Sequence, residues 1–388
     1  MTRPTSKAAL AALIIGHVAG MVDLAALPIW VNTLIEGYGY RPAMAGLLPT
    51  VFLLGAVLAS LIMSRMFDRV NRRRIPPLGY AVAALALLGV TRTDSFAAHL
   101  VLHGIGGLAV GSALSIVHGT LGRSANPHRA FACAGMGFGV FSLIFLGAVP
   151  QILSATGPAA FFWAVGAIMA VAALVSALLM PGDVASGGAG RTAVAAPLPA
   201  PVKRAIAGIM GMALVQGMVF SFLVQVGTAR GFGHGRIEGV LIVLGLVNLV
   251  PPALAALLQR HLRPMTVAPL GALVQGVFAL SIMAAPAFPG FAMPAVCFAA
   301  LLIFSHTFVF GFLAAQDPTG RAVAATPAML MTGSAVAPFL GGALVELWGF
   351  AAIGITGLLV GLLCAALFLS ARRAARRDAP VSAAGRPA

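Results

Sequence analysis

Long apolar segments separated by short polar breaks make up most of this 388-residue chain. About 18 or more mostly apolar residues in a helix can cross the roughly 30 Å hydrocarbon layer of a bilayer. Soluble domains rarely contain one such segment, whereas this chain contains about twelve. The pattern predicts an all-α polytopic membrane protein. We expect membrane-spanning helices at 8–33, 41–63, 75–91, 96–120, 130–154, 159–180, 205–228, 238–259, 266–284, 292–316, 322–346 and 350–370.

Positive charge alternates between the two sides that these helices define. If successive polar breaks lie on opposite sides, 20 of the 24 Lys and Arg residues share the side of the termini. The other side holds Arg41, Arg92, Arg230 and Arg236. Basic residues favour the cytoplasmic ends of membrane helices. We therefore expect a multi-pass protein of the cell membrane (a bacterial-type inner membrane), with both termini cytoplasmic.

The composition agrees with a polytopic membrane protein and argues against a nucleic-acid-binding protein. Hydrophobic residues form 60% of the chain and charged residues 9%, with a mean hydropathy of +1.01. A net charge of +15 could indicate nucleic-acid binding, but the basic residues lie between apolar segments instead of on one face of a soluble domain. Cys133, Cys297 and Cys364 lie in apolar segments and form no ligand cluster. We expect no nucleic-acid partner, no metal and no cofactor.

The longest polar break is rich in Gly, Ser and Pro and divides the expected helices into two sets of six. The predicted organisation is an N-terminal bundle over 1–180, a cytoplasmic linker over 181–204, a C-terminal bundle over 205–370 and a basic cytoplasmic tail over 371–388. Short polar sequences also repeat in equivalent loops of the two halves, at an offset near 191 residues. Duplicated halves of this kind meet at a site near the middle of the membrane.

The loop after the second helix reads Ser64-x-x-x-Asp68-Arg69-Val70-Asn71-Arg72-Arg73. It resembles the signature of the major facilitator superfamily, Gly-x-x-x-Asp-Arg/Lys-x-Gly-Arg/Lys-Arg/Lys, with Ser64 and Asn71 in place of the glycines. Ser is small and Asn tolerates positive φ, so both replacements are compatible with the motif. The segment 333–342 resembles the Gly- and Pro-rich stretch in helix 11 of that family, and the resemblance extends over residues 8–370.

This resemblance implies 12 transmembrane helices in two pseudo-symmetric six-helix bundles and transport by alternating access. It also implies a gating loop that latches the halves in the outward-facing state, formed by Ser64, Asp68, Arg69, Arg72 and Arg73. A solvated run of basic residues that only sets topology is the alternative for this loop. We expect the protein to function as a monomer.

Asp23 is the acidic residue that lies well inside an expected helix, and intramembrane ionisable groups are costly enough to be functional candidates. It lies about 22 Å along the first helix from Ala8. His103 in the fourth helix has a similar depth. An Asp–His pair could bind and release a proton in each transport cycle. An Asp satisfied by local hydroxyl, backbone or water contacts is the structural alternative.

Other polar residues of the apolar segments could line a substrate cavity, since helices 1, 4, 7 and 10 line it in the resembled family. The candidates are Asn32, His99, Gln216 and His306. Asn248 fits a structural role better. His99 and His103 have a spacing that zinc sites use, but no third ligand lies nearby in the sequence. Kinks are expected at Pro28, Pro150, Pro251, Pro252 and Pro338.

These features favour a secondary active transporter for a small neutral or cationic organic solute, coupled to protons through Asp23. No Lys or Arg lies deep in a span to attract a strongly anionic solute. The alternatives are an uncoupled facilitator and a transporter-like receptor that binds without transporting. An enzyme is not expected, because the sequence offers no nucleophile, dyad or metal constellation. No Gly-x-x-x-x-Gly-Lys-Ser/Thr motif occurs, so we do not expect ATP to power transport. The expected partners are the solute, protons and the lipid bilayer.

Overall fold

The computed structural model describes residues 6–124, 126–181, 198–317 and 326–377. Its first half contains α1 (Lys7–Gly20), α2 (Val22–Asn32), η1 (Thr33–Gly37), α3 (Pro42–Met66), α4 (Ile75–Val90), α5 (Phe96–Gly122), α6 (Pro127–Thr156) and α7 (Ala159–Leu179). Its second half contains α8 (Ala200–Ala229), α9 (His234–Val247), α10 (Pro251–Leu258), α11 (Pro264–Ala284), α12 (Phe288–Gln316), α14 (Thr326–Ala335), α15 (Ala337–Trp348) and α16 (Phe350–Arg377). The prediction of an all-α polytopic fold is confirmed: the described residues include 11 helical segments long and apolar enough to cross a membrane, and the shorter apolar α4.

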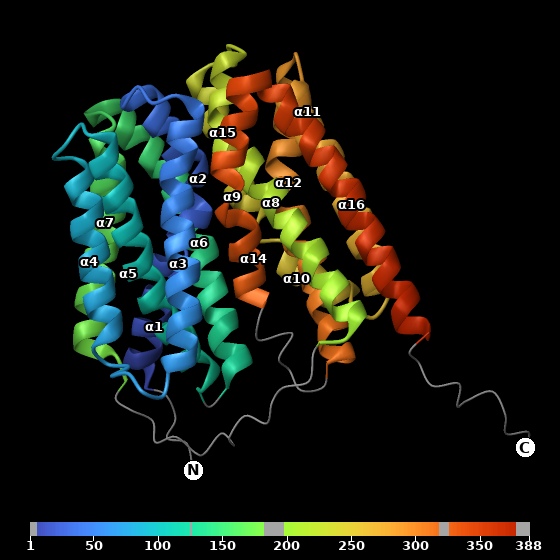
Figure 1. Cartoon of the computed structure of the whole chain (residues 1–388), viewed down its shortest axis with the longest axis horizontal. Helices are drawn as coiled ribbons and strands as arrows, with labels where there is room; N and C mark the ends of the chain where they lie inside the picture. The colour runs from blue at the N-terminus through green and yellow to red at the C-terminus, as the bar shows by residue number, and fades with distance from the viewer. Residues whose placement is uncertain (1–5, 125, 182–197, 318–325, 378–388) are drawn as a thin grey trace, which may run out of the picture.

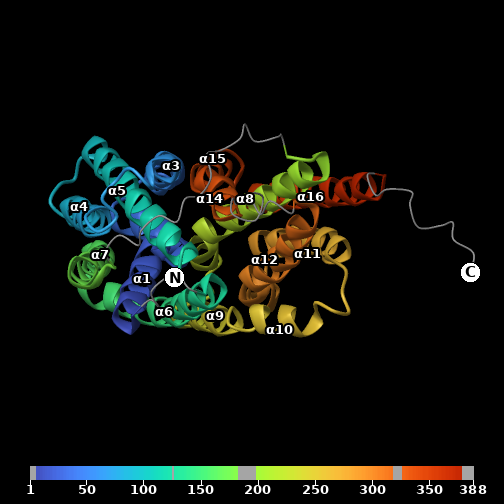
Figure 2. The same cartoon turned by 90° about the horizontal axis from the view of Figure 1, so that it is seen from below.

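The helices form two groups that lie side by side, α1–α7 and α8–α16 (Figure 1, Figure 2). The groups contact each other mainly where α3 packs on α14 and α15, where α2 packs on α8, and where α6 packs on α9. Large apolar side chains such as Leu85, Leu178 and Leu257 are exposed on the outer surface. A surface of this kind suits contact with lipid chains.

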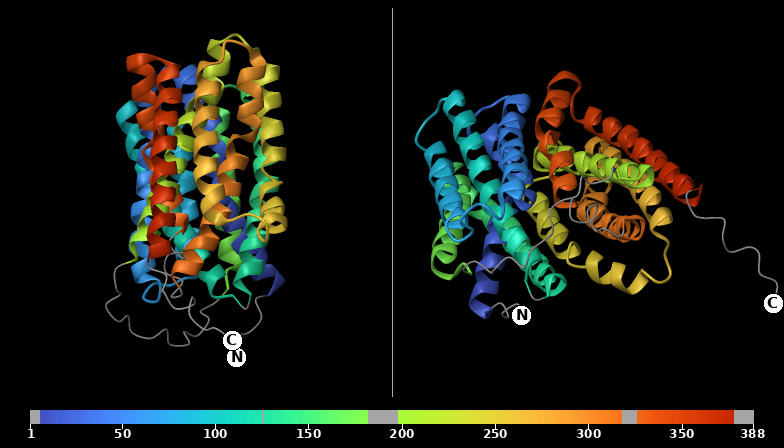
Figure 3. Two further views of the ribbon diagram at one scale, coloured as in Figure 1. Left: turned by 90° about the vertical axis from the view of Figure 1, so that its right-hand side faces the viewer. Right: turned by 60° about the horizontal axis from the view of Figure 1, so that its bottom comes forward.

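Two ends of the molecule are distinguished below. The basic face is the end at which α1 begins and α16 ends (Figure 3). The distal face is the opposite end, where η1 leads into α3 and α15 leads into α16. The two groups of helices lie together near the distal face and diverge toward the basic face (Figure 1).

Breaks interrupt the predicted helices at 8–33, 238–259 and 322–346. The first break is at Met21 (φ −109°, ψ 11°), after Gly20. The second separates α9 from α10 over 248–250, and the third is at Val336. Proline lacks the N–H that continues a helix, which explains the two breaks that precede Pro251-Pro252 and Pro338. At Pro28 and Pro150 the helical assignment continues instead.

The helices also extend beyond some predicted ends. Helix α8 begins at Ala200, inside the expected linker, and α16 continues to Arg377, inside the expected tail. Ala, Lys and Arg are good helix formers, so charge marks the membrane boundary without ending the helix. The predicted residues 322–325 and most of the linker lie outside the described part of the chain.

Candidate functional site

A cavity of about 140 Å³ lies between the two halves. Its polar wall contains Asp23 of α2, Gln216 of α8, Asn248 after α9 and Ser334 of α14. The rest of the lining is mainly apolar, so the few polar groups determine which atoms of a bound solute are recognised. Both halves therefore contribute polar groups to one central site.

Three of these polar residues lie beside the helix breaks. Asp23 follows Met21 by two positions, Asn248 begins the break after α9, and Ser334 precedes Val336 by two positions. Broken membrane helices release backbone groups that are tolerated only where they face protein or a cavity. Discontinuous helices near the middle of the bilayer build ion and substrate sites in many transporters. Three of these four polar residues are thus placed where the helical backbone is interrupted, whereas Gln216 lies within the continuous helix α8.

Asp23 is 5% exposed and lies in the first turn of α2. Within the described residues, no Lys or Arg forms an ion pair with it. Burial penalises a carboxylate, whereas the amino-terminal turn of a helix stabilises one. Two opposing effects of this kind suit a group that changes its protonation when its surroundings change.

The amides in the wall have distinct hydrogen bonds. Gln275 Nε2 donates to the Met212 carbonyl at 3.1 Å and contacts Gln216 Oε1 at 3.4 Å. The Gln216 oxygen therefore has a partner, whereas its NH₂ group donates to no other residue in the described part of the chain. Asn248 Oδ1 is buried and has no hydrogen-bond partner among the described residues. Asn248, for which we expected a structural role, therefore offers an unpaired acceptor in the cavity wall.

His99 and His103 lie elsewhere, fully buried within the N-terminal half. Trp30 Nε1 donates to His103 Nε2 at 3.3 Å, and His103 Nδ1 lies 2.7 Å from the His99 carbonyl. An indole N–H can only donate, so the His103 ring is neutral in this arrangement. His99 bonds the Tyr40 hydroxyl at 2.8 Å and the Val90 carbonyl at 2.9 Å. No hydrogen bond between described residues joins Asp23 to His103.

The other two predicted cavity residues also lie outside this central cavity. Asn32 lines a second cavity of about 520 Å³ near the distal face, together with Glu36, His234 and Glu238. His306 Nδ1 lies 2.9 Å from the Leu302 carbonyl, and its ring packs on Phe310. Gln216 is therefore the predicted substrate residue that shares the central cavity with Asp23.

Carboxylates join the halves at the distal face. Arg41 Nη1 donates to Glu346 Oε1 at 2.7 Å, and the backbone N–H of Ala43 donates to Glu346 Oε2 at 3.2 Å. Gln151 donates to Glu238 at 2.6 Å. Gln225 of α8 donates to Glu36 at 3.0 Å, so in this contact the donor belongs to the C-terminal half and the acceptor to the N-terminal half. Sequence reasoning missed these contacts, because the pairing depends on how two separate bundles meet.

The predicted gating loop follows α3 at the basic face. Asp68 accepts two hydrogen bonds from Arg123, at 2.5 and 3.0 Å. This pairing holds the pKa of the Asp68 carboxyl below its ordinary value. The Arg123 guanidinium also lies 4.5 Å from the centre of the Phe67 ring. The ion pair is contained within the N-terminal half in this structure. Its partner was not predicted, although Arg123 stands three residues after the fourth expected helix, 96–120.

Other parts of the loop have local roles. Ser64 Oγ donates to the Leu61 carbonyl, and Arg69 is exposed. Asn71 Oδ1 accepts from the backbone N–H groups of Arg73 and Arg74 at the start of α4. Asn71 does not use its tolerance of positive φ here, since no described non-Gly residue has positive φ. Asn replaces Gly here as a hydrogen-bond acceptor that fixes the turn.

A half-buried contact between two histidines was not anticipated. His17 Nδ1 of α1 lies 2.9 Å from His118 Nε2 of α5. A hydrogen bond needs one donor and one acceptor, so one proton lies between the two rings. His118 also lines a cavity of about 560 Å³ at the basic face, next to Arg123 and Ser64. The available signal was that both histidines fall inside expected helices.

Two helical bundles around a central, mainly apolar cavity with a few polar wall residues define the architecture of a membrane transporter. Residues 12–318 match the sequence profile of the Major Facilitator Superfamily. The chain belongs to this family of transporters, as its loop motif suggested. A search of curated protein sequences finds no match.

Solved structures of transporters share this fold. A bacterial homologue of the human lysosomal transporter Spinster, in an inward-facing and occupied conformation, superposes with a TM-score of 0.76 at 15% identity, covering 99% of this chain and 100% of that one. The nucleoside transporter NupG gives 0.72 at 14% identity, covering 96% and 100%. The POT family transporter PepTSo gives 0.74 at 10% identity, covering 97% and 99%. At these identities the similarity shows the fold alone.

Proposed function

We propose that the chain is a secondary active transporter that moves a small neutral or cationic organic solute by alternating access, coupled to protons through Asp23. The observation that carries this proposal is a buried carboxylate in the wall of a cavity that both halves share. A buried carboxylate without an ion-pair partner can compensate a cationic solute or carry a proton. The Gln216 donor and the Asn248 acceptor would orient neutral polar groups.

The contacts at the distal face support alternating access. Glu36, Glu238 and Glu346 each accept a hydrogen bond from the opposite half. These contacts hold the halves together on one side of the central cavity, while the Asp68–Arg123 pair stays within one half at the other side. In the opposite state of the cycle, the distal contacts would break and the basic loop would meet the C-terminal half. We take the basic face as cytoplasmic, from the distribution of Lys and Arg.

The test is Asp23→Asn in proteoliposomes that contain a pH-sensitive dye. A panel of neutral polar solutes and monovalent organic amines is added, and proton movement and solute uptake are both recorded across pH 5.5–8.5, with and without an imposed gradient. Asn keeps the size of the side chain but does not titrate. The variant should still exchange solute, yet lose gradient-driven accumulation. Ser142→Ala is the matched control, because Ser142 lines the same cavity and donates to its own helix at Phe138.

Each alternative gives a different result. Solute-driven proton movement that persists in Asp23→Asn contradicts coupling through this residue. Solute uptake without proton movement in the unmodified protein identifies an uncoupled facilitator. Saturable binding without uptake identifies a receptor.

A further inference from the structure

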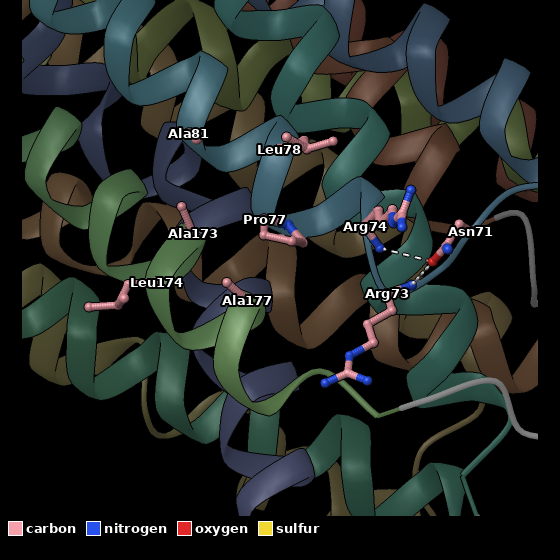
Figure 4. Close-up of a pocket in the computed structure, with 9 residues that line it drawn as sticks. All are labelled: Asn71, Arg73, Arg74, Pro77, Leu78, Ala81, Ala173, Leu174 and Ala177. Atoms are coloured by element: carbon pink, nitrogen blue, oxygen red, sulfur yellow. Dashed lines mark hydrogen bonds between the residues drawn. The ribbon is translucent and has the colours of Figure 1, made fainter.

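A large groove lies on the outer surface, away from the central cavity, between α4 and α7 at the basic face. Its volume is about 840 Å³. Its walls are apolar, with Leu78 and Ala81 on α4 and Ala173, Leu174 and Ala177 on α7. Figure 4 shows Arg73 and Arg74 at one end of this groove, just before the first turn of α4.

No acid in the described part of the chain pairs with the two arginines at the end of the groove. The nearest acid in the sequence, Asp68, is bonded to Arg123. Among the described residues, neither the Arg73 nor the Arg74 guanidinium has an ion-pair partner, and no acidic residue lines the groove. The hydrogen bonds from both backbone N–H groups to Asn71 fix the turn without using either guanidinium.

We propose that this groove binds an anionic phospholipid from the leaflet at the basic face. Arg73 and Arg74 would bind the headgroup phosphate, and the channel between α4 and α7 would hold the upper part of an acyl chain. From Arg74 to Ala81 the groove follows α4 for about 10 Å into the membrane. Basic pockets between membrane helices at the cytoplasmic side recognise anionic headgroups in this way. An acyl chain would cover the apolar walls, which otherwise face water or loosely packed lipid. The walls therefore favour a lipid over a free anion.

The experiment measures the thermal midpoint of the purified full chain in detergent during titration with phosphatidylglycerol, phosphatidylcholine or inorganic phosphate. Phosphatidylglycerol should raise the midpoint saturably, and the other two should not. In Arg73→Gln/Arg74→Gln, half-saturation should need roughly 25-fold more phosphatidylglycerol, about fivefold for each arginine. The charge-matched control is Arg376→Gln/Arg377→Gln, which removes two exposed arginines from the end of α16 and should leave the titration unchanged.

Ala177→Phe tests the channel separately, because it fills the groove without changing charge. It should weaken phosphatidylglycerol binding while native mass spectrometry still detects a folded monomer. If the double arginine variant is too unstable to purify, Arg74→Gln and Ala177→Phe give the same comparison.

Three results would overturn the proposal. An equal shift with inorganic phosphate would identify a simple anion site. An equal loss in both arginine pairs would indicate general surface charge. An unchanged titration in Ala177→Phe would show that no acyl chain occupies the channel.

Discussion

Two glycines at the distal face set how closely the halves approach each other. A Cβ atom built on Gly46 of α3 would lie 2.1 Å from the backbone oxygen of Pro338 in α15. A Cβ atom on Gly342 of α15 would lie 2.3 Å from the backbone oxygen of Pro42 in α3. Backbone atoms cannot turn aside as a flexible side chain can. Gly46→Ala must therefore separate α3 from α15.

The size of the effect follows from these distances. Ordinary van der Waals contact of a Cβ atom begins at 3.4 Å, so the helices must move apart by more than 1 Å at this point. Overpacking of this kind costs about 1–3 kcal/mol. If the cost falls on the state that is closed at the distal face, the balance between the two states shifts by roughly 5- to 150-fold.

A cysteine reporter at Thr50 measures this shift. Thr50 is 4% exposed, lies one turn beyond Gly46 on α3, and accepts a hydrogen bond from the Phe339 backbone N–H across the same interface. In a background without the native cysteines, Thr50→Cys should react slowly with a membrane-impermeant maleimide. The addition of Gly46→Ala should raise the rate at least fivefold, within the population shift estimated above.

The matched control is Gly239→Ala. Gly239 lies in α9, and a Cβ atom there meets nothing within 4 Å. This variant should keep the slow reaction, with no loss of thermal stability. A Gly46→Ala protein that is folded, monodisperse and as unreactive as the control would refute the close approach of α3 and α15.

Three further variants test the polar contacts. His118→Gln should shift the pH profile of the proposed proton-coupled transport while the protein stays folded, because the amide can replace the hydrogen bond to His17 but cannot titrate. His261→Gln, in the exposed loop after α10, should leave that profile unchanged. The pKa of Asp68 is lowered in the folded state, so its ion pair with Arg123 stabilises the protein above the unfolded-state pKa of about 4. This stabilisation is lost as the pH falls through the folded-state pKa. In Asp68→Asn, the decrease in thermal midpoint over that acidic range should therefore disappear. Asn248→Leu should raise stability by about 1 kcal/mol, since it removes a buried acceptor that has no partner among the described residues, yet it should weaken solute binding. Ser176→Ala removes a second such oxygen, in α7, and should leave transport unchanged.

The number and type of the helices followed from the sequence, because a bilayer requires apolar helices of a minimum length. The breaks before Pro251 and Pro338 were also readable, since proline removes a backbone donor. The break at Met21 was not, because Gly20 alone does not distinguish a break from a close helix contact. A Cβ atom at Gly20 would lie 2.6 Å from Leu114, so this glycine also permits close packing.

Individual candidate residues depended on contacts between helices that a one-dimensional pattern does not contain. Depth along two helices suggested that Asp23 and His103 could meet. Depth does not give the direction of a side chain around the helix axis, and His103 instead bonds Trp30. In contrast, Gln216 does reach the cavity of Asp23. The prediction that Asp23 carries the coupling proton stands untested.

The helix breaks and the distal contacts together suggest how the proposed coupling could work. Asp23, Asn248 and Ser334 lie beside breaks in three helices, two of which belong to the C-terminal half. Backbone dihedrals at a break can change without loss of a full helical turn. When the halves rock, the segments at the breaks can therefore move more readily than continuous helices can. The surroundings of the Asp23 carboxylate would then differ between the two states, and its proton affinity with them. A charge in the middle of a continuous helix would change its surroundings only through the rigid-body movement of the halves. Asp23 lies two residues after a break, so a local change of the backbone can add to that movement, and the proposed coupling rests on this position.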